Sequence, residues 1–178
     1  MSDAAPAETE TQAELDQPET PVRPESPGHP ESLAHPESLA HPILTDDYAT
    51  EWMGLEVLAL GDGSATVATT LRREMLNGFG IAHGGMIFAI ADSAFALACN
   101  PHTPDEGQAG TITVAAGVGV KFLAPAHVGE RITAVAARRA QAGRSGLYDV
   151  QVFASPDADT SGRLIAEFRG RSRTIPQR

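Results

Sequence analysis

The sequence has only one cysteine, Cys99, among its 178 residues. A single cysteine cannot form a disulfide within the chain, and it cannot supply the thiolates of a multi-cysteine zinc site. No apolar run reaches the ~18 residues that a membrane-spanning helix needs. The first residues also lack the basic start and the apolar stretch of a secretory leader. These absences predict a protein of a reducing compartment, most simply the cytoplasm.

Basic residues are scarce as well. There are 13 Lys and Arg against 23 Asp and Glu, which gives a formal net charge of −10. Nucleic-acid binding requires a basic surface that neutralises phosphates, and anionic membranes attract polybasic segments. We therefore expect neither a nucleic acid nor a membrane as a partner.

The negative charge is concentrated in residues 1–42, which contain nine acidic residues, one basic residue and eight of the 13 prolines. Such a segment has too little apolar surface to offset the entropy of ordering it. Its repeated histidines are six residues apart, roughly 19 Å in an extended chain at ~3.1 Å per residue, which is too far to share one metal ion. The sequence predicts a disordered acidic, proline-rich tail over residues 1–42 and one folded domain over residues 43–178.

Periodicity predicts the elements of the domain. Two strand-like stretches, 55–60 and 64–71, flank the turn signal Gly61-Asp62-Gly63 and indicate a hairpin. Residues 84–99 form an apolar run whose length and composition favour a helix buried on every face, and Asn100-Pro101 ends it. Four further strand-like stretches follow, at residues 111–123, 131–140, 147–155 and 163–175. One apolar helix with a large antiparallel sheet predicts an α+β domain whose sheet curls around the helix.

Asp92 is out of place in this helix. Its neighbours are apolar, and the helix contains no lysine or arginine that could pair with it. An ionised carboxylate that is buried without a partner costs several kcal/mol. Asp92 therefore faces a cleft, or is buried with hydrogen-bonding partners, or is protonated. A structural aspartate that caps a loop or lies at a subunit seam fits this pattern as well as a catalytic one does.

A glycine-rich segment leads directly into the helix. In His83-Gly84-Gly85 the glycines allow another group to approach the backbone closely. The N–H groups of the first helical turn are free and carry the positive end of the helix dipole. Such amides can stabilise a developing oxyanion. Combined with the unpaired Asp92, this segment points to acyl chemistry.

The spacing between these two features constrains the site. Gly84 and Asp92 are eight residues apart, roughly 12 Å along a helix that rises 1.5 Å per residue. Acyl chemistry needs both groups within ~3 Å of one carbonyl. If both act, they must come from two chains, which predicts an obligate homodimer.

Several segments resemble the hotdog-fold acyl-CoA thioesterases, in particular the PaaI branch of phenylacetate degradation. The similarity covers about residues 44–175 and is carried by Met75–Gly78, His83–Gly85, Ala91–Ala96, Ala98–Asn100, Phe122–Pro125, Gly146–Asp149 and Phe168–Gly170. The resemblance implies a curled antiparallel sheet around one long helix. It also implies hydrolysis of (hydroxy)phenylacetyl-CoA-like or related acyl-CoA thioesters to free acid and CoA. No metal or cofactor would be used, and the family pattern favours a homotetramer.

The resemblance also assigns roles to residues. Asp92 is implied as the nucleophile or as the general base on water, and the Gly84 N–H as the donor to the thioester carbonyl. Asn77 is implied to orient water or the acyl group, and His83 to position the loop or to form a hydrogen bond near the sulfur. The implied substrate-binding residues are Phe79, Gly85, Arg144 and Gly146.

Cationic side chains are expected to contact the phosphates of coenzyme A. The candidates are Arg138, Arg139 and Arg144 near one turn, and Arg169, Arg171 and Arg173, which the two-residue strand period places on one face of the last strand. A solvated face explains each of them equally well.

Two other functions stay open. A non-catalytic acyl-CoA-binding or regulatory dimer is expected if Asp92 is neutral and enclosed. An enoyl-CoA hydratase or dehydratase needs a histidine base on or directly after the helix, whereas His102 follows Pro101 in a predicted loop.

Overall fold

The computed structural model describes Met1 and residues 39–103, 110–158 and 161–177. The acidic tail predicted for residues 1–42 lies outside the described residues between positions 2 and 38. The last part of that segment already contacts the domain. The Leu39 N–H donates to the Val57 carbonyl at 3.0 Å, and the His41 ring lies 3.2 Å from the Asn100 carbonyl.

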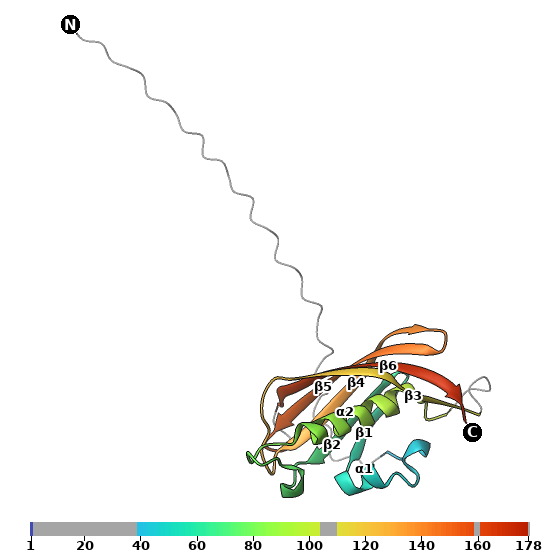
Figure 1. Cartoon of the computed structure of the whole chain (residues 1–178), viewed down its shortest axis with the longest axis horizontal. Helices are drawn as coiled ribbons and strands as arrows, with labels where there is room; N and C mark the ends of the chain where they lie inside the picture. The colour runs from blue at the N-terminus through green and yellow to red at the C-terminus, as the bar shows by residue number, and fades with distance from the viewer. Residues whose placement is uncertain (2–38, 104–109, 159–160, 178) are drawn as a thin grey trace. The chain divides into compact units, whose positions relative to one another are not determined.

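Six strands form one sheet in the order β1-β2-β4-β5-β6-β3, and every neighbouring pair is antiparallel. The strands are β1 (Glu56–Gly61), β2 (Ser64–Thr70), β3 (Thr111–Phe122), β4 (Arg131–Ala142), β5 (Ser145–Ser155) and β6 (Arg163–Pro176). The long helix α2 (Gly84–Cys99) lies across the sheet and contacts all six strands (Figure 1). The predicted curled sheet around one long helix is confirmed.

Local sequence signals account for these boundaries. The β1–β2 hairpin turns at Asp62-Gly63, where Gly63 has a φ of +71° that favours glycine. His83 caps the start of α2, and Asn100 ends it with an extended backbone before Pro101. No helix among the described residues is long and apolar enough to cross a membrane.

The sheet-facing side of α2 forms the core. Phe95 is 1% exposed, and its ring lies 5.3 Å from Tyr148 of β5 and 5.7 Å from Phe168 of β6. Burying an aromatic side chain of this size stabilises the fold by about 1.5–3 kcal/mol. The helix is therefore held against the middle of the sheet by aromatic packing.

The prediction that α2 is buried on every face is wrong. A stripe of the helix stays partly exposed: Gly85, Phe88, Ala89, Asp92, Ser93 and Ala96. The sheet packs against the opposite face, and two short elements, η1 (Pro42–Leu44) and α1 (Tyr48–Met53), lie beside this stripe and line a half-open cavity with it. The apolar pattern indicated burial on every face because Asp92 and Ser93 are the only polar residues of this helix and the rest of the stripe is apolar.

The short helix α1 was not predicted, since six residues carry too little periodicity. Its ends are nevertheless well defined. Asp47 accepts a hydrogen bond from the Thr50 N–H at the start, and Gly54 at the end has a φ of 63°. The Thr69 hydroxyl of β2 donates to the Met53 carbonyl at 2.7 Å, which ties the end of α1 to the sheet.

Strand β3 lies at the edge of the sheet, and within the described part of the chain its one strand partner is β6. Residues 114–119 are all exposed, and Val118, Phe122 and Leu123 are 41%, 54% and 55% exposed. An unpaired strand edge with apolar side chains is a template for pairing with another chain.

Candidate active site

Asp92 lies on the partly exposed stripe of α2 and is half-buried. Its carboxylate has no ion pair and no hydrogen bond with any residue in the described part of the chain. Burial raises the pKa of Asp92 above its ordinary value. Of the alternatives left open by the sequence, the structure shows a carboxylate that faces a cleft.

The cleft is a cavity of about 330 Å³ between α2 and the N-terminal elements. One wall consists of Ile43, Leu44, Asp47, Ala49, Thr50 and Met53, and the other of Phe88, Ala89, Asp92, Ser93 and Ala96. The lining is mainly apolar and contains two carboxylates, Asp92 on α2 and Asp47, which caps the short helix α1. The first wall was missed from the sequence, although Asp47 and Gly54 are the cap residues of a short helix.

The first turn of α2 holds a free amide. His83 Nδ1 accepts a hydrogen bond from the Gly85 N–H at 2.9 Å, so the Gly85 amide is already used. No described residue accepts a hydrogen bond from the Gly84 N–H. A Cβ atom placed on Gly84 would lie 3.1 Å from the Phe122 ring. The Gly84 amide is therefore the first-turn donor that remains available to a ligand.

Asn77 organises the loop before α2. Its side-chain oxygen accepts from the Phe79 N–H at 2.9 Å and from the Ile81 N–H at 3.4 Å. Its side-chain nitrogen has no acceptor among the described residues, so one polar group remains for a ligand. Phe79 projects from this loop with 90% of its surface exposed.

The structure brings together Asn77, Phe79, His83, Gly84 and Gly85 around the N-terminus of α2. Asp92 lies on the same helix, eight residues and roughly 12 Å further along. One chain therefore does not place the Gly84 amide and the Asp92 carboxylate at the same carbonyl.

Arg144 and Gly146 lie toward the other end of α2. Gly146 pairs with Ser172 of β6, and Ser172 pairs with Ala115 of β3. Two residues before Ala115, Thr113 is hydrogen-bonded to Asn100, the residue that ends α2. Arg144 is exposed in the β4–β5 turn.

Gly146 itself is buried and has a clear packing role. Its N–H donates to the Ser172 hydroxyl at 3.1 Å. An added Cβ atom would lie 2.7 Å from the Tyr148 ring and 2.9 Å from the Ser172 hydroxyl. Only glycine fits here without a shift of buried side chains.

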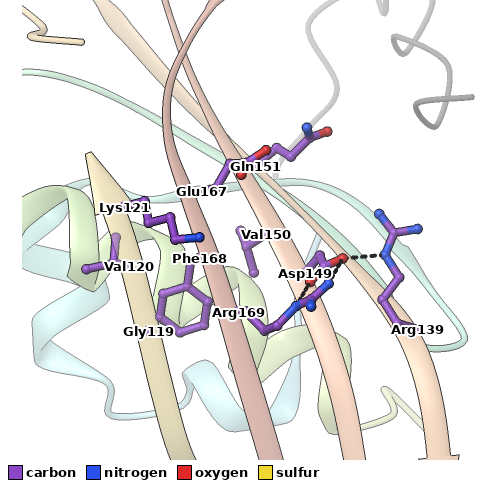
Figure 2. Close-up of a pocket in the computed structure, with 10 residues that line it drawn as sticks. All are labelled: Gly119, Val120, Lys121, Arg139, Asp149, Val150, Gln151, Glu167, Phe168 and Arg169. Carbon is purple, nitrogen blue, oxygen red and sulfur yellow. Dashed lines mark hydrogen bonds and ion pairs between the residues drawn. The ribbon is translucent and has the colours of Figure 1, made fainter. Parts of the chain in front are cut away.

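Three of the candidate arginines form ion pairs within the described part of the chain. Arg138 pairs with Asp62 at 2.6 Å. Figure 2 shows Asp149 between Arg139 and Arg169. The two ion pairs measure 2.8 and 2.6 Å, and these residues line a groove of about 610 Å³. The Arg169 hydrogen bond is the main cause that lowers the pKa of Asp149.

The predicted common face of β6 is confirmed, because Arg169, Arg171 and Arg173 are exposed while Gly170 and Ser172 between them are buried. The groove of Figure 2 is lined by none of the eight residues assigned to the site from the sequence.

Comparison with known proteins agrees with this fold. A family model described as "Thioesterase superfamily" matches residues 79–161. The acyl-coenzyme A thioesterase PaaI of Escherichia coli is 33% identical over 130 residues, which cover 73% of this chain and 84% of that protein. The chain belongs to the thioesterase superfamily, as its resemblance to the hotdog-fold thioesterases implied, and it is a thioester hydrolase.

Solved structures point to the same branch. The structure of the E. coli PaaI protein from the phenylacetic acid degradation operon matches with a TM-score of 0.66 at 32% identity. The match covers 76% of this chain and 89% of the E. coli chain. The structure of a mutant of the phenylacetic acid degradation protein PaaI from Thermus thermophilus matches with a TM-score of 0.61 at 35% identity. The match covers 71% of this chain and 98% of the T. thermophilus chain.

Proposed function

We propose that this protein is a homodimeric acyl-CoA thioesterase that acts on phenylacetyl-CoA-like or related substrates. Asp92 of one protomer and the Gly84 amide of the other would form each of two equivalent sites. The observation that carries the proposal is the half-buried Asp92 carboxylate, unpaired among the described residues, on the wall of an apolar cavity. The identity to PaaI over most of the domain supports the substrate class.

The environment of Asp92 suits a base or a nucleophile. A carboxylate with a raised pKa accepts a proton more readily than an ordinary one near neutral pH. Its desolvation also removes water that would compete with a reacting group. Both roles use the same oxygen atoms, so both belong to the proposal.

A two-fold symmetric dimer would bring the Gly84 amide of one protomer to the Asp92 carboxylate of the other. Phe88 is midway between positions 84 and 92 on α2. If two α2 helices lie antiparallel about an axis at Phe88, Gly84 of each is opposite the partner's Asp92. Gly85, which is exposed near the start of this helix and lies outside the lining of the cavity, has no side chain and permits a close approach of the partner.

The position of β3 at the edge of the sheet also supports a homodimer. Antiparallel pairing of two β3 edges would satisfy their backbone groups and cover the exposed Val118 and Phe122. The assembly of two such dimers into a homotetramer rests on the resemblance to the family.

The reaction needs only water and thioester, with no cofactor. Asp92 as a base takes a proton from water, whose oxygen attacks the carbonyl carbon. The Gly84 N–H stabilises the oxyanion, the C–S bond breaks, and the thiolate of CoA leaves and is protonated. Asp92 as a nucleophile would instead form an acyl-aspartyl anhydride, which water then hydrolyses.

Other residues would hold the substrate. The free Asn77 nitrogen would donate to the acyl group or to the attacking water, and the His83 cap keeps the Gly85 amide in place. Phe79 and Gly85 would contact the thioester arm. Arg144, exposed in its turn, would meet the phosphates of CoA.

The test is CoA thiol release from a panel of acyl-CoAs by the wild type and by Asp92→Asn. This change keeps the size of the side chain but removes its charge and most of its basicity. We expect kcat to fall by about 10²–10⁴-fold with CoA binding retained. Asp62→Asn, the same change in the exposed β1–β2 turn, is the matched control and keeps wild-type activity.

The same assay decides between the functions. Thiol release by Asp92→Asn at the wild-type rate would remove the proposed role of Asp92. A wild type that binds CoA esters and releases no thiol would establish the non-catalytic binder. Hydration of an enoyl-CoA without thiol release would establish the hydratase, although His102 is exposed beyond the end of α2.

A further inference from the structure

The N-terminal segment 39–54 supplies half of the Asp92 cavity, although it belongs neither to the sheet nor to the central helix. It contributes η1 and α1, which together we call the wall. A cavity of about 330 Å³ is at the small end of the ~300–1,000 Å³ range of ligand pockets. It has room for an acyl group but not for a whole CoA ester, so the wall would contact the acyl part of the substrate.

Hydrogen bonds near both ends hold segment 39–54 to the rest of the domain, and one of them joins the Leu39 N–H to the Val57 carbonyl of β1 at 3.0 Å. At its C-terminal end, the Met53 carbonyl accepts hydrogen bonds from the Thr69 hydroxyl at 2.7 Å and from Arg72 at 3.1 Å. At its N-terminal end, the His41 ring is 5% exposed and lies 3.2 Å from the carbonyl of Asn100, which ends α2.

The hydrogen bonds of His41 define its tautomer. Its Nδ1 accepts from the Ile43 N–H at 3.3 Å, so Nδ1 carries no proton. Its Nε2 must then carry the proton and donate it to the Asn100 carbonyl. One neutral ring therefore caps η1 on one side and joins the wall to α2 on the other.

Asn100 connects this anchor to the catalytic helix. Its side-chain nitrogen donates to the Ala96 carbonyl at 3.0 Å and to the Thr113 carbonyl at 2.9 Å. Ala96 lines the cavity together with Asp92. Hydrogen bonds therefore connect His41, through Asn100, to Ala96 on the cavity wall and to Thr113 near the start of β3.

We propose that His41 is a positioning residue that holds the wall over Asp92 and so determines which acyl groups are preferred. The inference rests on the proposed thioesterase function. Acyl groups that reach the wall, such as phenylacetyl, depend on this anchor. An acetyl group has far less surface to place against the wall, so we expect it to depend on this anchor less.

The experiment compares kcat/KM for phenylacetyl-CoA and acetyl-CoA in three variants of the full chain. His41→Ala removes both hydrogen bonds of the ring. His41→Asn keeps an acceptor near the Nδ1 position, which can still cap η1. His41→Gln keeps a donor near the Nε2 position, which can still reach the Asn100 carbonyl.

We expect His41→Ala to lower the ratio of kcat/KM for phenylacetyl-CoA to that for acetyl-CoA by about three- to tenfold, the range of one hydrogen bond. The loss should appear as a raised KM for phenylacetyl-CoA. His41→Gln restores the ratio, and His41→Asn does not. His127→Ala, which removes an exposed histidine from the β3–β4 loop, is the matched control and leaves the ratio unchanged.

The outcomes separate this inference from the proposed function. A general loss of stability would lower both rates together and leave their ratio unchanged. An unchanged ratio in a folded His41→Ala variant therefore refutes the inference alone. If His41→Ala does not fold, equal ratios in the Asn and Gln variants refute it. A wild type that hydrolyses neither substrate refutes the proposed function and with it the inference.

Discussion

Replacing Gly84 by proline tests the amide at the start of α2. Proline is well tolerated at the first position of a helix, where the N–H makes no helical hydrogen bond. The preceding residue, His83, has φ −66° and ψ 129°, which is the conformation that a following proline requires. Gly84→Pro therefore removes the proposed oxyanion donor while leaving the helix intact.

The size of the effect follows from the role of the amide. Loss of one oxyanion-hole donor typically lowers kcat by about 10²–10³-fold. Gly84→Ala is the matched control, because it adds a Cβ atom but keeps the N–H. That Cβ atom would lie 3.1 Å from the end of the half-exposed Phe122 ring, which can move by a few tenths of an ångström. We expect Gly84→Ala to keep most of its thiol-release activity.

Mixing variants tests whether the site is shared between chains. Co-expression of Gly84→Pro with Asp92→Asn in equal amounts makes about half of the dimers mixed, and one of the two sites in each mixed dimer is complete. The thiol-release assay should then recover about a quarter of wild-type activity, although each variant alone is inactive. Mixed dimers purified through two different tags that stay inactive would refute the two-chain site.

Three further predictions follow from single groups. Burial raises the pKa of Asp92, so its charge destabilises the fold at neutral pH. In calorimetry at pH 7, Asp92→Asn should therefore melt at a higher temperature than the wild type. This difference in melting temperature should shrink as the pH falls through the raised pKa of Asp92. Burial, with a smaller effect of the neighbouring His102, lowers the pKa of His41 below 6.5. As the pH falls, the histidine of the unfolded chain is therefore protonated before that of the folded chain. In urea titrations, the stability of the wild type relative to His41→Gln should fall as the pH drops below about 6.5. Gly146→Ala should destabilise the protein by about 1–3 kcal/mol in the same titrations, since its Cβ atom would press on Tyr148; unchanged stability would contradict the packing role of this glycine.

Much of the fold was accessible from periodicity. The helix Gly84–Cys99 was predicted with its observed bounds, because the apolar run starts at Gly84-Gly85 and the following Asn100-Pro101 is a strong stop signal. The strands were predicted to within two residues at each end. The short helix α1 was missed, because six residues contain too few repeats to show a period.

The candidate site was only partly accessible. The sequence alone identified Asp92, because it is an aspartate without a basic partner in an apolar helix. The structure places Asp92 in the lining of a cavity, which is one of the positions expected for it. Periodicity said nothing of the wall formed by η1 and α1, whose residues are distant from Asp92 in the chain. The role of Gly146 also required the structure, since its contacts with Tyr148 and Ser172 join different parts of the sheet.

The sequence alone determined the order of the strands and the helix, and it singled out Asp92 and Gly84, because caps, turns and an unpaired charge act over a few neighbouring residues. Their separation along one helix also follows from the sequence, since the rise per residue is constant. Only the tertiary structure decided which face of α2 the sheet leaves open and that His41 ties a distant segment to the end of that helix. Those features depend on contacts between residues far apart in the chain, and such contacts exist only once the sheet has curled around α2.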